Sequence, residues 1–387
     1  MPGIVLFLMT CQRNRRDSGI VGFLFAVLTI VFCSTLRTGP LQAEETDPVK
    51  RARQEIRVMQ QWYDKNSGLW WGKMGWWNHA NALTTIIRYS KFAGDKRSFP
   101  TIEHTFQQAR RFHGKNFLNE FYDDEGWWAL AWVEAYELTG KREYLDMAVS
   151  IFDDMTGGWS DEFGGGIYWK KNEKYKASIA NNLFSLLGLR LYANGVKKKI
   201  RGHTPLEWAR RDWQWFSKTG LILSDIWQIG DGVAPEGLRK NAHWTYNQGL
   251  AIAVLVELYK VDKDKEKLEM AENIARATMK RLSRNGVLRE FIEPKLAGDG
   301  AQFKGIFMRH LYTLYAETRG QEYYDFIVAN GDAVWKHRNR ETGVMRAIWC
   351  EPSGDSKGET VGNAHSSALD AIVSQIGAQK IKPRPSE

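Results

Sequence analysis

The amino-acid sequence predicts an all-α protein built as an (α/α)6 barrel, a toroid of six helical hairpins. Apolar residues recur with helical spacing along most of the chain, and strand-like alternation is scarce. The segments between the expected helices alternate between short polar turns and long loops rich in Gly, Trp and Asp. With 43% hydrophobic and 26% charged residues, the 387-residue chain has the composition of a globular protein, not a disordered one.

The helical spacing marks about a dozen segments. They cover residues 48–62, 78–93, 98–113, 126–139, 142–155, 175–194, 204–218, 246–261, 264–283, 302–319, 321–337 and 363–378. The short connections are 94–97, 140–141, 262–264 and 320–321, and such turns join antiparallel neighbours. Alternation of short and long connections would bring all the long loops to one end of the barrel. We call this end the mouth and expect the long loops to surround it.

The long loops share a faint repeated pattern. Residues 62–71, 159–169 and 339–349 each contain an acidic residue, then a turn glycine, then an aromatic. The chain also has 17 Trp, whose flat apolar faces can stack on sugar rings but also fill cores. One interpretation is that these loops direct aromatic side chains at the mouth. The other is that the acidic residues and glycines only build turns, which leaves the recurring aromatic unexplained.

The segment FYDDEGWWALAW, residues 121–132, places two aspartates directly before an apolar helix. One interpretation is that Asp123 or Asp124 caps this helix. The other is glycoside hydrolysis, which uses two carboxyls about 5–5.5 Å apart in retaining enzymes and about 6.5–9.5 Å apart in inverting ones. Adjacent residues favour the shorter separation, and therefore retention. Two close carboxyls also raise one pKa, which keeps one group protonated near neutral pH.

The segment YDDEGWWALAWVEAYELTG resembles the catalytic segment of glycoside hydrolase family 76, the α-1,6-mannanases. Further stretches resemble the family in the same order: WWNHANAL, GGGIYWK, ANNLFSLLGLRLY, TYNQGLAIAVLVELYK, FKGIFMRHLYTLY and AHSSALDAI. The resemblance implies an (α/α)6 fold and retaining endo-cleavage of α-1,6-linked mannan. It also implies that Asp123 is the nucleophile and Asp124 the acid/base. His79 departs from the residue expected in WWNHANAL, and Glu125 adds a third carboxyl.

Other side chains are candidates for substrate binding. Asn247 and Gln248, beside Tyr246, carry amides that can donate to and accept from sugar hydroxyls, or can only satisfy a helix start. Asp231 could bind a sugar diol or build a turn, and Lys304 lies near a helix start at the expected mouth. The remaining candidates are the aromatic residues expected to stack on sugars or desolvate the carboxyls, and one amide of the WWNHANAL segment: Trp76, Trp77, Trp127, Trp128, Tyr168, Trp169 and Asn81.

The N-terminus has the features of an export signal. Arg13, Arg15 and Arg16 precede a short apolar run from Ile20 to Phe32, and Leu41-Gln42-Ala43 is a plausible cleavage site. An uncleaved anchor is the alternative, but the run is shorter than the roughly 20 residues of a spanning helix. We predict a signal peptide over 1–43, a single catalytic domain over 44–387, no stable membrane span after cleavage, and a periplasmic or secreted protein.

Several functional classes are disfavoured. The eight His show no pair at metal-ligand spacing, and the chain has no phosphate-binding glycine motif, so we expect neither metal nor cofactor. The formal net charge is +9, but the basic residues are scattered, which disfavours nucleic acid as a partner. We expect a monomer that acts on α-mannan. A mannan transglycosylase, a sugar epimerase on the same barrel and a non-catalytic glycan-binding protein are the alternatives.

Overall fold

The computed structural model describes residues 45–112, 115–296, 298–351 and 361–384. The predicted signal peptide, residues 1–43, lies outside these ranges and stays a prediction. Residues 45–387 group as one compact unit by their contacts. Among the described helices, none combines the length and the apolar character that crossing a membrane requires.

The described residues form twelve α-helices that alternate between an outer and an inner layer. The outer helices are α1 (Pro48–Gln60), α3 (Phe99–Ala109), α5 (Arg142–Thr156), α7 (Pro205–Phe216), α9 (Lys265–Arg281) and α11 (Gln321–Lys336). The inner helices are α2 (Trp76–Ala93), α4 (Tyr122–Thr139), α6 (Ser178–Ala193), α8 (Thr245–Asp262), α10 (Gly300–Thr318) and α12 (Val361–Gln379). Two short 3-10 turns, Lys96–Ser98 and Glu162–Gly164, complete the helical structure.

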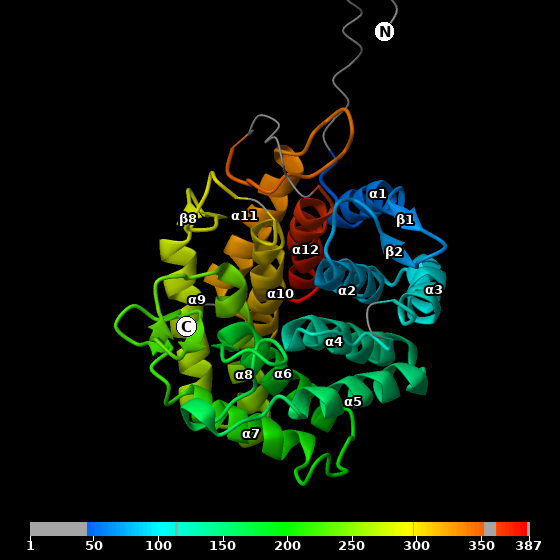
Figure 1. Cartoon of the computed structure of the whole chain (residues 1–387). Coiled ribbons are helices and arrows are strands. Elements are labelled where there is room, and N and C mark those ends of the chain that lie inside the picture. The colour runs from blue at the N-terminus through cyan, green and yellow to red at the C-terminus, as the bar shows by residue number, and fades with distance from the viewer. Residues whose placement is uncertain (1–44, 113–114, 297, 352–360, 385–387) are drawn as a thin grey trace, which may run out of the picture. The chain divides into compact units, whose positions relative to one another are not determined.

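The inner helices close into a ring. Each packs on the next in the order α2, α4, α6, α8, α10 and α12, and α12 packs back on α2. Outer helices cover this ring: α5 packs on α4, α7 on α6, α9 on α8, and α11 on α12 (Figure 1). The predicted (α/α)6 barrel is therefore confirmed.

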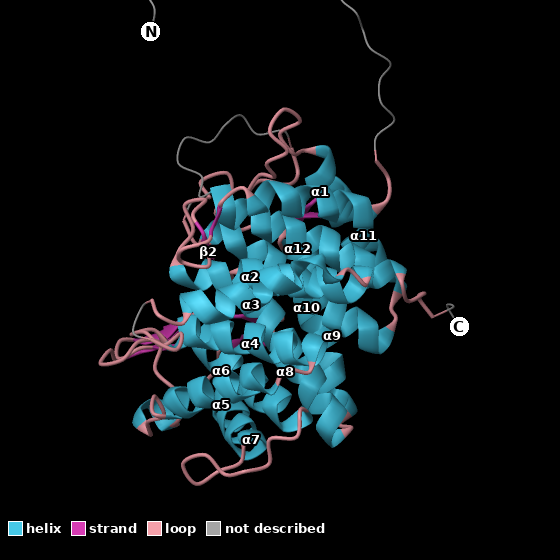
Figure 2. Cartoon of the chain, turned by 90° about the vertical axis from the view of Figure 1, so that its right-hand side faces the viewer, coloured by secondary structure: helices cyan, strands magenta, loops and turns pink. Residues whose placement is uncertain are grey.

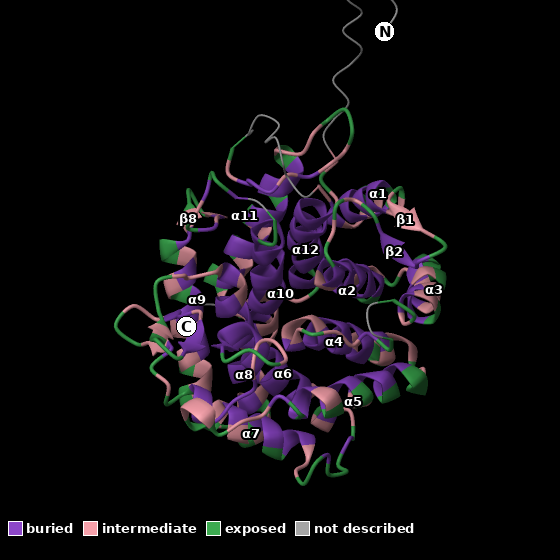
Figure 3. Cartoon of the chain, viewed as in Figure 1, coloured by how far each residue is buried: buried purple, intermediate pink, exposed green. Residues whose placement is uncertain are grey.

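The two layers differ in sequence because they differ in burial. In α8 the run Asn247 to Val256 is buried throughout, since this helix has neighbours on every side. In α9 only Ala271, Ile274, Ala275 and Thr278 are buried, at the spacing that faces one side of a helix. Figure 3 shows the same contrast, with exposed positions concentrated on the outer helices and loops.

The strands are short and lie in the long connections that lead from outer to inner helices (Figure 2). Three antiparallel hairpins are β1 (Tyr63–Asp64) with β2 (Leu69–Trp70), β4 (Ile222–Leu223) with β5 (Gln228–Ile229), and β8 (Ser283–Arg284) with β9 (Val287–Leu288). A three-stranded sheet pairs β3 (Lys176–Ala177) with β6 (Gly232–Ala234) and β6 with β7 (Gly237–Arg239). These connections all reach the N-terminal ends of the inner helices, which form the mouth.

Helix α4 begins four residues earlier than the sequence pattern indicates. Its N-cap is Phe121, so the paired aspartates lie inside the first turn and neither is the N-cap. The capping interpretation of Asp123 and Asp124 was therefore wrong. Carboxylates in a first helical turn are stabilised by the positive end of the helix dipole, and Glu125 adds a third.

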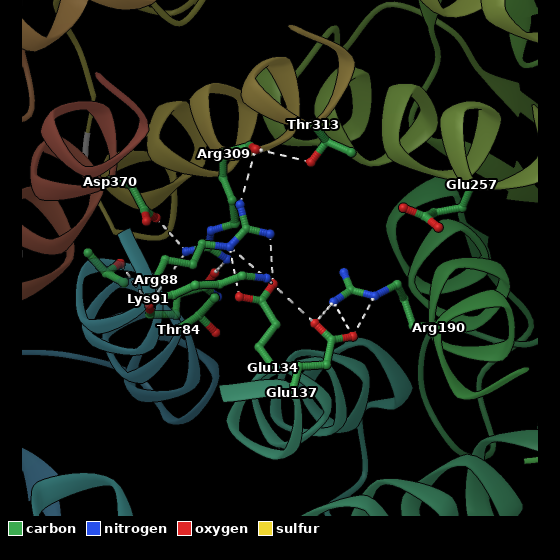
Figure 4. A network of polar contacts seen from close by, with 12 residues as sticks. Thr84, Arg88, Lys91, Glu134, Glu137, Arg190, Glu257, Arg309, Thr313 and Asp370 are labelled. Atoms are coloured by element: carbon green, nitrogen blue, oxygen red, sulfur yellow. Dashed lines mark hydrogen bonds and ion pairs between the residues drawn. The ribbon is translucent and has the colours of Figure 1, made fainter. Parts of the chain in front are cut away.

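The other end of the ring carries side chains whose charges alternate from helix to helix. Around the ring these are Arg88 on α2, Glu134 and Glu137 on α4, Arg190 on α6, Glu257 on α8, Arg309 on α10 and Asp370 on α12 (Figure 4). Arg88 meets Glu134 at 2.7 Å, and both side chains are about one-tenth exposed. Burial raises the pKa of Glu134, but the nearby guanidinium groups, first among them that of Arg88, together outweigh burial and hold that pKa at about 2. Arg88 thus ties α2 to α4, while Arg190 pairs with Glu137 to tie α6 to α4, and Arg309 pairs with Asp370 to tie α10 to α12.

Glycines let neighbouring inner helices approach closely. A Cβ at Gly305 of α10 would collide with the backbone of Ser367 on α12, and a Cβ at Gly249 of α8 would lie 2.8 Å from the Cα of Phe307 on α10. Backbone atoms cannot yield as the end of a flexible side chain can. These two contacts therefore require glycine at helix-interior positions where alanine is the better helix former.

Gly305→Ala is expected to destabilise the protein by about 2 kcal/mol, because relief of the collision costs more than the roughly 1 kcal/mol that alanine contributes to a helix. Urea unfolding of the wild type and the variant measures the difference. Unchanged or increased stability would contradict the close packing of α10 on α12.

Candidate active site

A pocket of about 300 Å³ opens at the mouth, at the N-terminal ends of the inner helices. Its lining comes from α2, α4, α6, α8, α10 and the connections that precede them: Trp77, Asp123, Trp127, Trp169, Glu173, Tyr175, Ala177, Ile179, Asp231, Arg239, Trp244, Tyr246, Asp299 and Phe303. Its volume lies at the small end of the range for ligand sites, about 300–1,000 Å³. Aromatic walls and several carboxyls suit a polyhydroxylated ligand with apolar ring faces.

Asp123 lies at the second position of α4 and lines the pocket. Its Oδ1 is buried and has no hydrogen-bond partner among the described residues. Burial raises the pKa of Asp123 to about 7, although hydrogen bonding from Trp169 opposes the rise. Asp299, in the same pocket, adds to the rise through its negative charge. The pKa of Asp123 therefore lies well above that of an ordinary aspartate.

Asp124 follows Asp123 in the first turn of α4. Its Oδ2 accepts a hydrogen bond of 2.6 Å from the Asn119 side chain. Burial, and then the charge of Asp123, raise the pKa of Asp124 well above its ordinary value. Two close, buried carboxyls resist ionising together, which favours retention of one proton by the pair near neutral pH.

The third acidic residue of the segment has a different environment. Glu125 is fully buried, and its Oε1 accepts a hydrogen bond of 2.7 Å from Lys171, which also binds Asp154 at 2.7 Å. Burial raises the pKa of Glu125 to about 8, although Lys171 opposes the rise. Glu125 therefore ties the connection between α5 and α6 to the start of α4, next to the aspartate pair.

The connection between α5 and α6 supplies one wall of the pocket. Its Lys176 ammonium donates to three backbone carbonyls of the same connection, those of Ser160, Glu162 and Gly165, at 2.6–2.7 Å. Burial lowers the pKa of Lys176 to about 8, although nearby acidic groups oppose the fall. This internal anchor fixes the path of the connection that carries Trp169 and Tyr175.

Asp231 is held by its neighbours on two sides. The Tyr175 hydroxyl donates to Oδ2 at 2.7 Å, and the Asn247 side chain donates to Oδ1 at 3.3 Å. The backbone N–H of Asp231 donates to the carbonyl of Arg239. The pairing of β3, β6 and β7 thus carries this carboxylate to the pocket and fixes its direction.

Another wall of the pocket is aromatic. Trp77 of α2 stacks on Trp127 of α4 with ring centroids 5.7 Å apart, and Tyr246 of α8 stacks on Phe303 of α10 at 3.8 Å. The Trp77 indole N–H donates to Asp299 Oδ1 at 3.0 Å. Flat apolar faces and a fixed carboxylate therefore occur side by side, and this combination can contact both the C–H face and the hydroxyls of a sugar.

The sequence analysis predicted that two pairs of adjacent tryptophans contact substrate. In each pair, one tryptophan lines the pocket and the other lies in the core. Trp77 and Trp127 line the pocket, whereas Trp76 and Trp128 pack on each other in the core at a centroid distance of 4.8 Å. Trp128 is fully buried. Consecutive helical residues point about 100° apart, so only one member of each pair can face the lumen.

Two other predicted substrate contacts lie away from the pocket. Asn81 is fully buried and accepts a hydrogen bond from Arg309 at 2.9 Å. Lys304 is also fully buried, and its ammonium is ion-paired with Glu293. Both side chains have partners inside the protein and do not line the pocket.

The remaining predicted contacts surround the pocket. Tyr168 donates to Glu162 at 2.5 Å and lies outside the lining. Asn247 is buried beneath the pocket, where it supports Asp231. Gln248 is buried and bonds both the N–H and the carbonyl of Ile229, at 2.8 and 3.0 Å. Asn247 and Gln248 therefore position the connection that precedes α8.

The structure also places residues in the pocket that the sequence analysis did not single out. The principal ones are Glu173, Tyr175, Arg239, Trp244, Asp299 and Phe303. Two of them carried a usable signal: Trp244 and Asp299 are the N-cap residues of inner helices α8 and α10. Because inner helix starts form the mouth, a search of every such start would have found both.

Comparison with known proteins identifies related chains. A model of glycosyl hydrolase family 76 matches residues 49–386. The chain is 25% identical over 212 residues to mannan endo-1,6-alpha-mannosidase DCW1 of Candida albicans, covering 49% of this chain and 46% of the relative. The protein of the same name from Saccharomyces cerevisiae is 26% identical over 218 residues, covering 51% and 47%. The chain thus spans about half the length of these relatives.

A solved structure shares the fold with a TM-score of 0.77 and 21% identity, covering 85% of this chain and 99% of the other. It is an inactive variant of an α-1,6-mannanase from Salegentibacter, with two consecutive aspartates replaced by asparagine, in complex with α-1,6-mannotriose. This likeness concerns the fold alone, whereas the family match runs over nearly the whole sequence. The chain belongs to glycosyl hydrolase family 76.

Proposed function

We propose that this protein is a retaining endo-α-1,6-mannanase. The observation that carries the proposal is the adjacent carboxyl pair, Asp123 and Asp124, at a pocket with aromatic walls. Two relatives are named mannan endo-1,6-alpha-mannosidases, and the Salegentibacter α-1,6-mannanase is inactive when two consecutive aspartates are asparagines. These likenesses support the same substrate class here. The place of Asp231 in the pocket lining supports a substrate contact for its carboxylate, and the basic and apolar pattern at the N-terminus supports export.

The proposed reaction has two steps. In the first, an ionised Asp123 oxygen bonds to the anomeric carbon, the glycosidic C–O bond breaks, and Asp124 gives its proton to the leaving 6-oxygen. In the second, Asp124 takes a proton from water while the water oxygen displaces Asp123 from the same carbon. Each step inverts that carbon, so the product keeps the α configuration. Burial and the charge of Asp123 raise the pKa of Asp124, which supports its assignment as the acid.

The test is to incubate the purified protein with unbranched α-1,6-mannan and follow the products by chromatography and proton NMR. Short oligosaccharides whose new reducing ends are first α would support the proposal. New ends that are first β would contradict retention. Products longer than the starting chains would favour transglycosylation instead.

Asp299→Asn is expected to move the pH profile of kcat/KM to lower pH. The Asp299 charge adds to the raised pKa of both Asp123 and Asp124, so its loss should lower both. The asparagine oxygen can still accept the Trp77 hydrogen bond, which preserves the pocket wall. Initial rates on α-1,6-mannan across pH 4–9 measure the shift. An unchanged profile would contradict electrostatic coupling of Asp299 to the pair.

A further inference from the structure

One exposed aromatic residue lies next to the pocket. Trp71, Phe112 and Phe291 are the large apolar side chains that the described part of the chain leaves exposed, and Phe291 is 40% exposed. The Phe291 ring contacts the Trp244 ring with centroids 4.6 Å apart, and Trp244 lines the pocket. Neither Trp71 nor Phe112 belongs to that lining. Phe291 therefore extends the apolar surface of the pocket to the outside.

The aromatic surface is continuous from Phe291 to the inner wall. Trp244 contacts Phe303 edge-on at 5.2 Å, and Phe303 lies 6.1 Å from Trp77, whose indole binds Asp299. A chain of rings thus leads from the carboxylates to the protein surface. A bound ligand that outgrew the pocket in this direction would meet aromatic faces.

Buried hydrogen bonds and an ion pair hold the segment that carries Phe291 in place. Its neighbour Glu290 is fully buried and accepts hydrogen bonds from the backbone N–H and the hydroxyl of Thr245, the residue after Trp244. Glu293 accepts from the Glu290 N–H at 3.0 Å and is ion-paired with the buried Lys304. These contacts hold the backbone beside both Phe291 and Trp244 in place. Ligand binding therefore costs little conformational entropy at these two residues.

We propose that Phe291 and Trp244 form an outer sugar-binding platform. The platform stacks against a mannose residue of an α-1,6-mannan chain that has already filled the pocket. This inference rests on the proposed function, because an endo-acting enzyme must bind a polymer and the 300 Å³ pocket is too small for more than a short part of it. Phe291 is accordingly a determinant of chain-length preference and takes no part in bond cleavage.

Phe291→Ala is expected to raise KM for α-1,6-mannohexaose about fivefold, the effect of losing one stacked apolar sugar face. The KM for α-1,6-mannotriose should change less than about twofold, because a short ligand is held by the pocket alone. Phe112→Ala is the matched control, since Phe112 is 38% exposed and lies outside the pocket lining. Phe291→Trp keeps an aromatic face at this position, so unlike Phe291→Ala it should retain the wild-type preference for the longer substrate.

The outcomes separate the two proposals. If the wild type cleaves neither oligosaccharide, the proposed function fails, whatever the variants do. If it cleaves both and Phe291→Ala changes the two KM values by the same factor, the platform is wrong while the function stands. A circular dichroism spectrum of Phe291→Ala that matches the wild type excludes misfolding as the cause of a selective effect.

Discussion

Asp123→Asn and Asp124→Asn are each expected to lower kcat on α-1,6-mannan by about 10³-fold or more. Asparagine keeps the size of aspartate but can neither bond covalently to the anomeric carbon as a carboxylate does nor exchange a proton with the leaving group. Release of reducing ends measures the loss. Glu120→Gln, which removes an exposed carboxyl just before the segment that carries both aspartates, should keep the wild-type rate.

Azide distinguishes the two roles. In an Asp124→Ala variant assayed on an activated aryl α-mannoside, azide should intercept the covalent intermediate and give an α-mannosyl azide. In Asp123→Ala, azide should replace the nucleophile and give the β-azide, because only one inversion occurs. The opposite pattern would exchange the assigned roles, and full activity of either asparagine variant would remove that residue from catalysis.

The second large effect concerns stability. Asp370→Ala is expected to lower the free energy of unfolding by about 3–5 kcal/mol, because it leaves the Arg309 cation buried without its anionic partner. Both side chains of this pair are almost completely buried. Burial raises the pKa of Asp370, with Arg309 opposing the rise, so the pair depends on close contact to keep both charges. Urea unfolding at pH 7 measures the change.

Two controls test whether the unpaired charge causes the loss. The double variant Arg309→Met/Asp370→Leu should be more stable than Asp370→Ala, because it leaves no unpaired charge in the core. Asp146→Ala breaks the exposed pair with Arg142 and should cost less than about 1 kcal/mol. Equal losses in all three variants would show that burial does not govern the energy of these pairs.

Sequence periodicity located the helices well because inner and outer helices differ in how many faces they bury. The alternation of connection lengths also identified the mouth, since a turn such as residues 140–141 can only join antiparallel neighbours. Sequence periodicity could not show which of two adjacent side chains points into the barrel. Trp76 and Trp77 have the same chemistry, and only the packing of α2 against its neighbours shows that Trp77 faces the pocket while Trp76 packs on Trp128.

Non-local partners account for the other differences. Lys304 looks available for substrate in the sequence, but the preceding connection folds back and brings Glu293 to its ammonium. Asp299, between two glycines, has the pattern of an ordinary turn until α10 is seen to start at the mouth beside Trp77. Ion pairs between distant residues, and the paths of the long loops, depend on tertiary structure. The spacing of residues along the sequence does not reveal them.

The closure of the ring by α12 has a consequence for synthesis of the protein. Helix α12 packs against α1, α2, α10 and α11, so it joins the early and the late helices of the described residues. Until it leaves the ribosome, the apolar sides of α2 and α10 that it covers have no partner. Completion of the fold therefore waits for contacts of very high sequence separation, which are slow to form. We expect the nascent chain to need protection from aggregation until α12 has emerged.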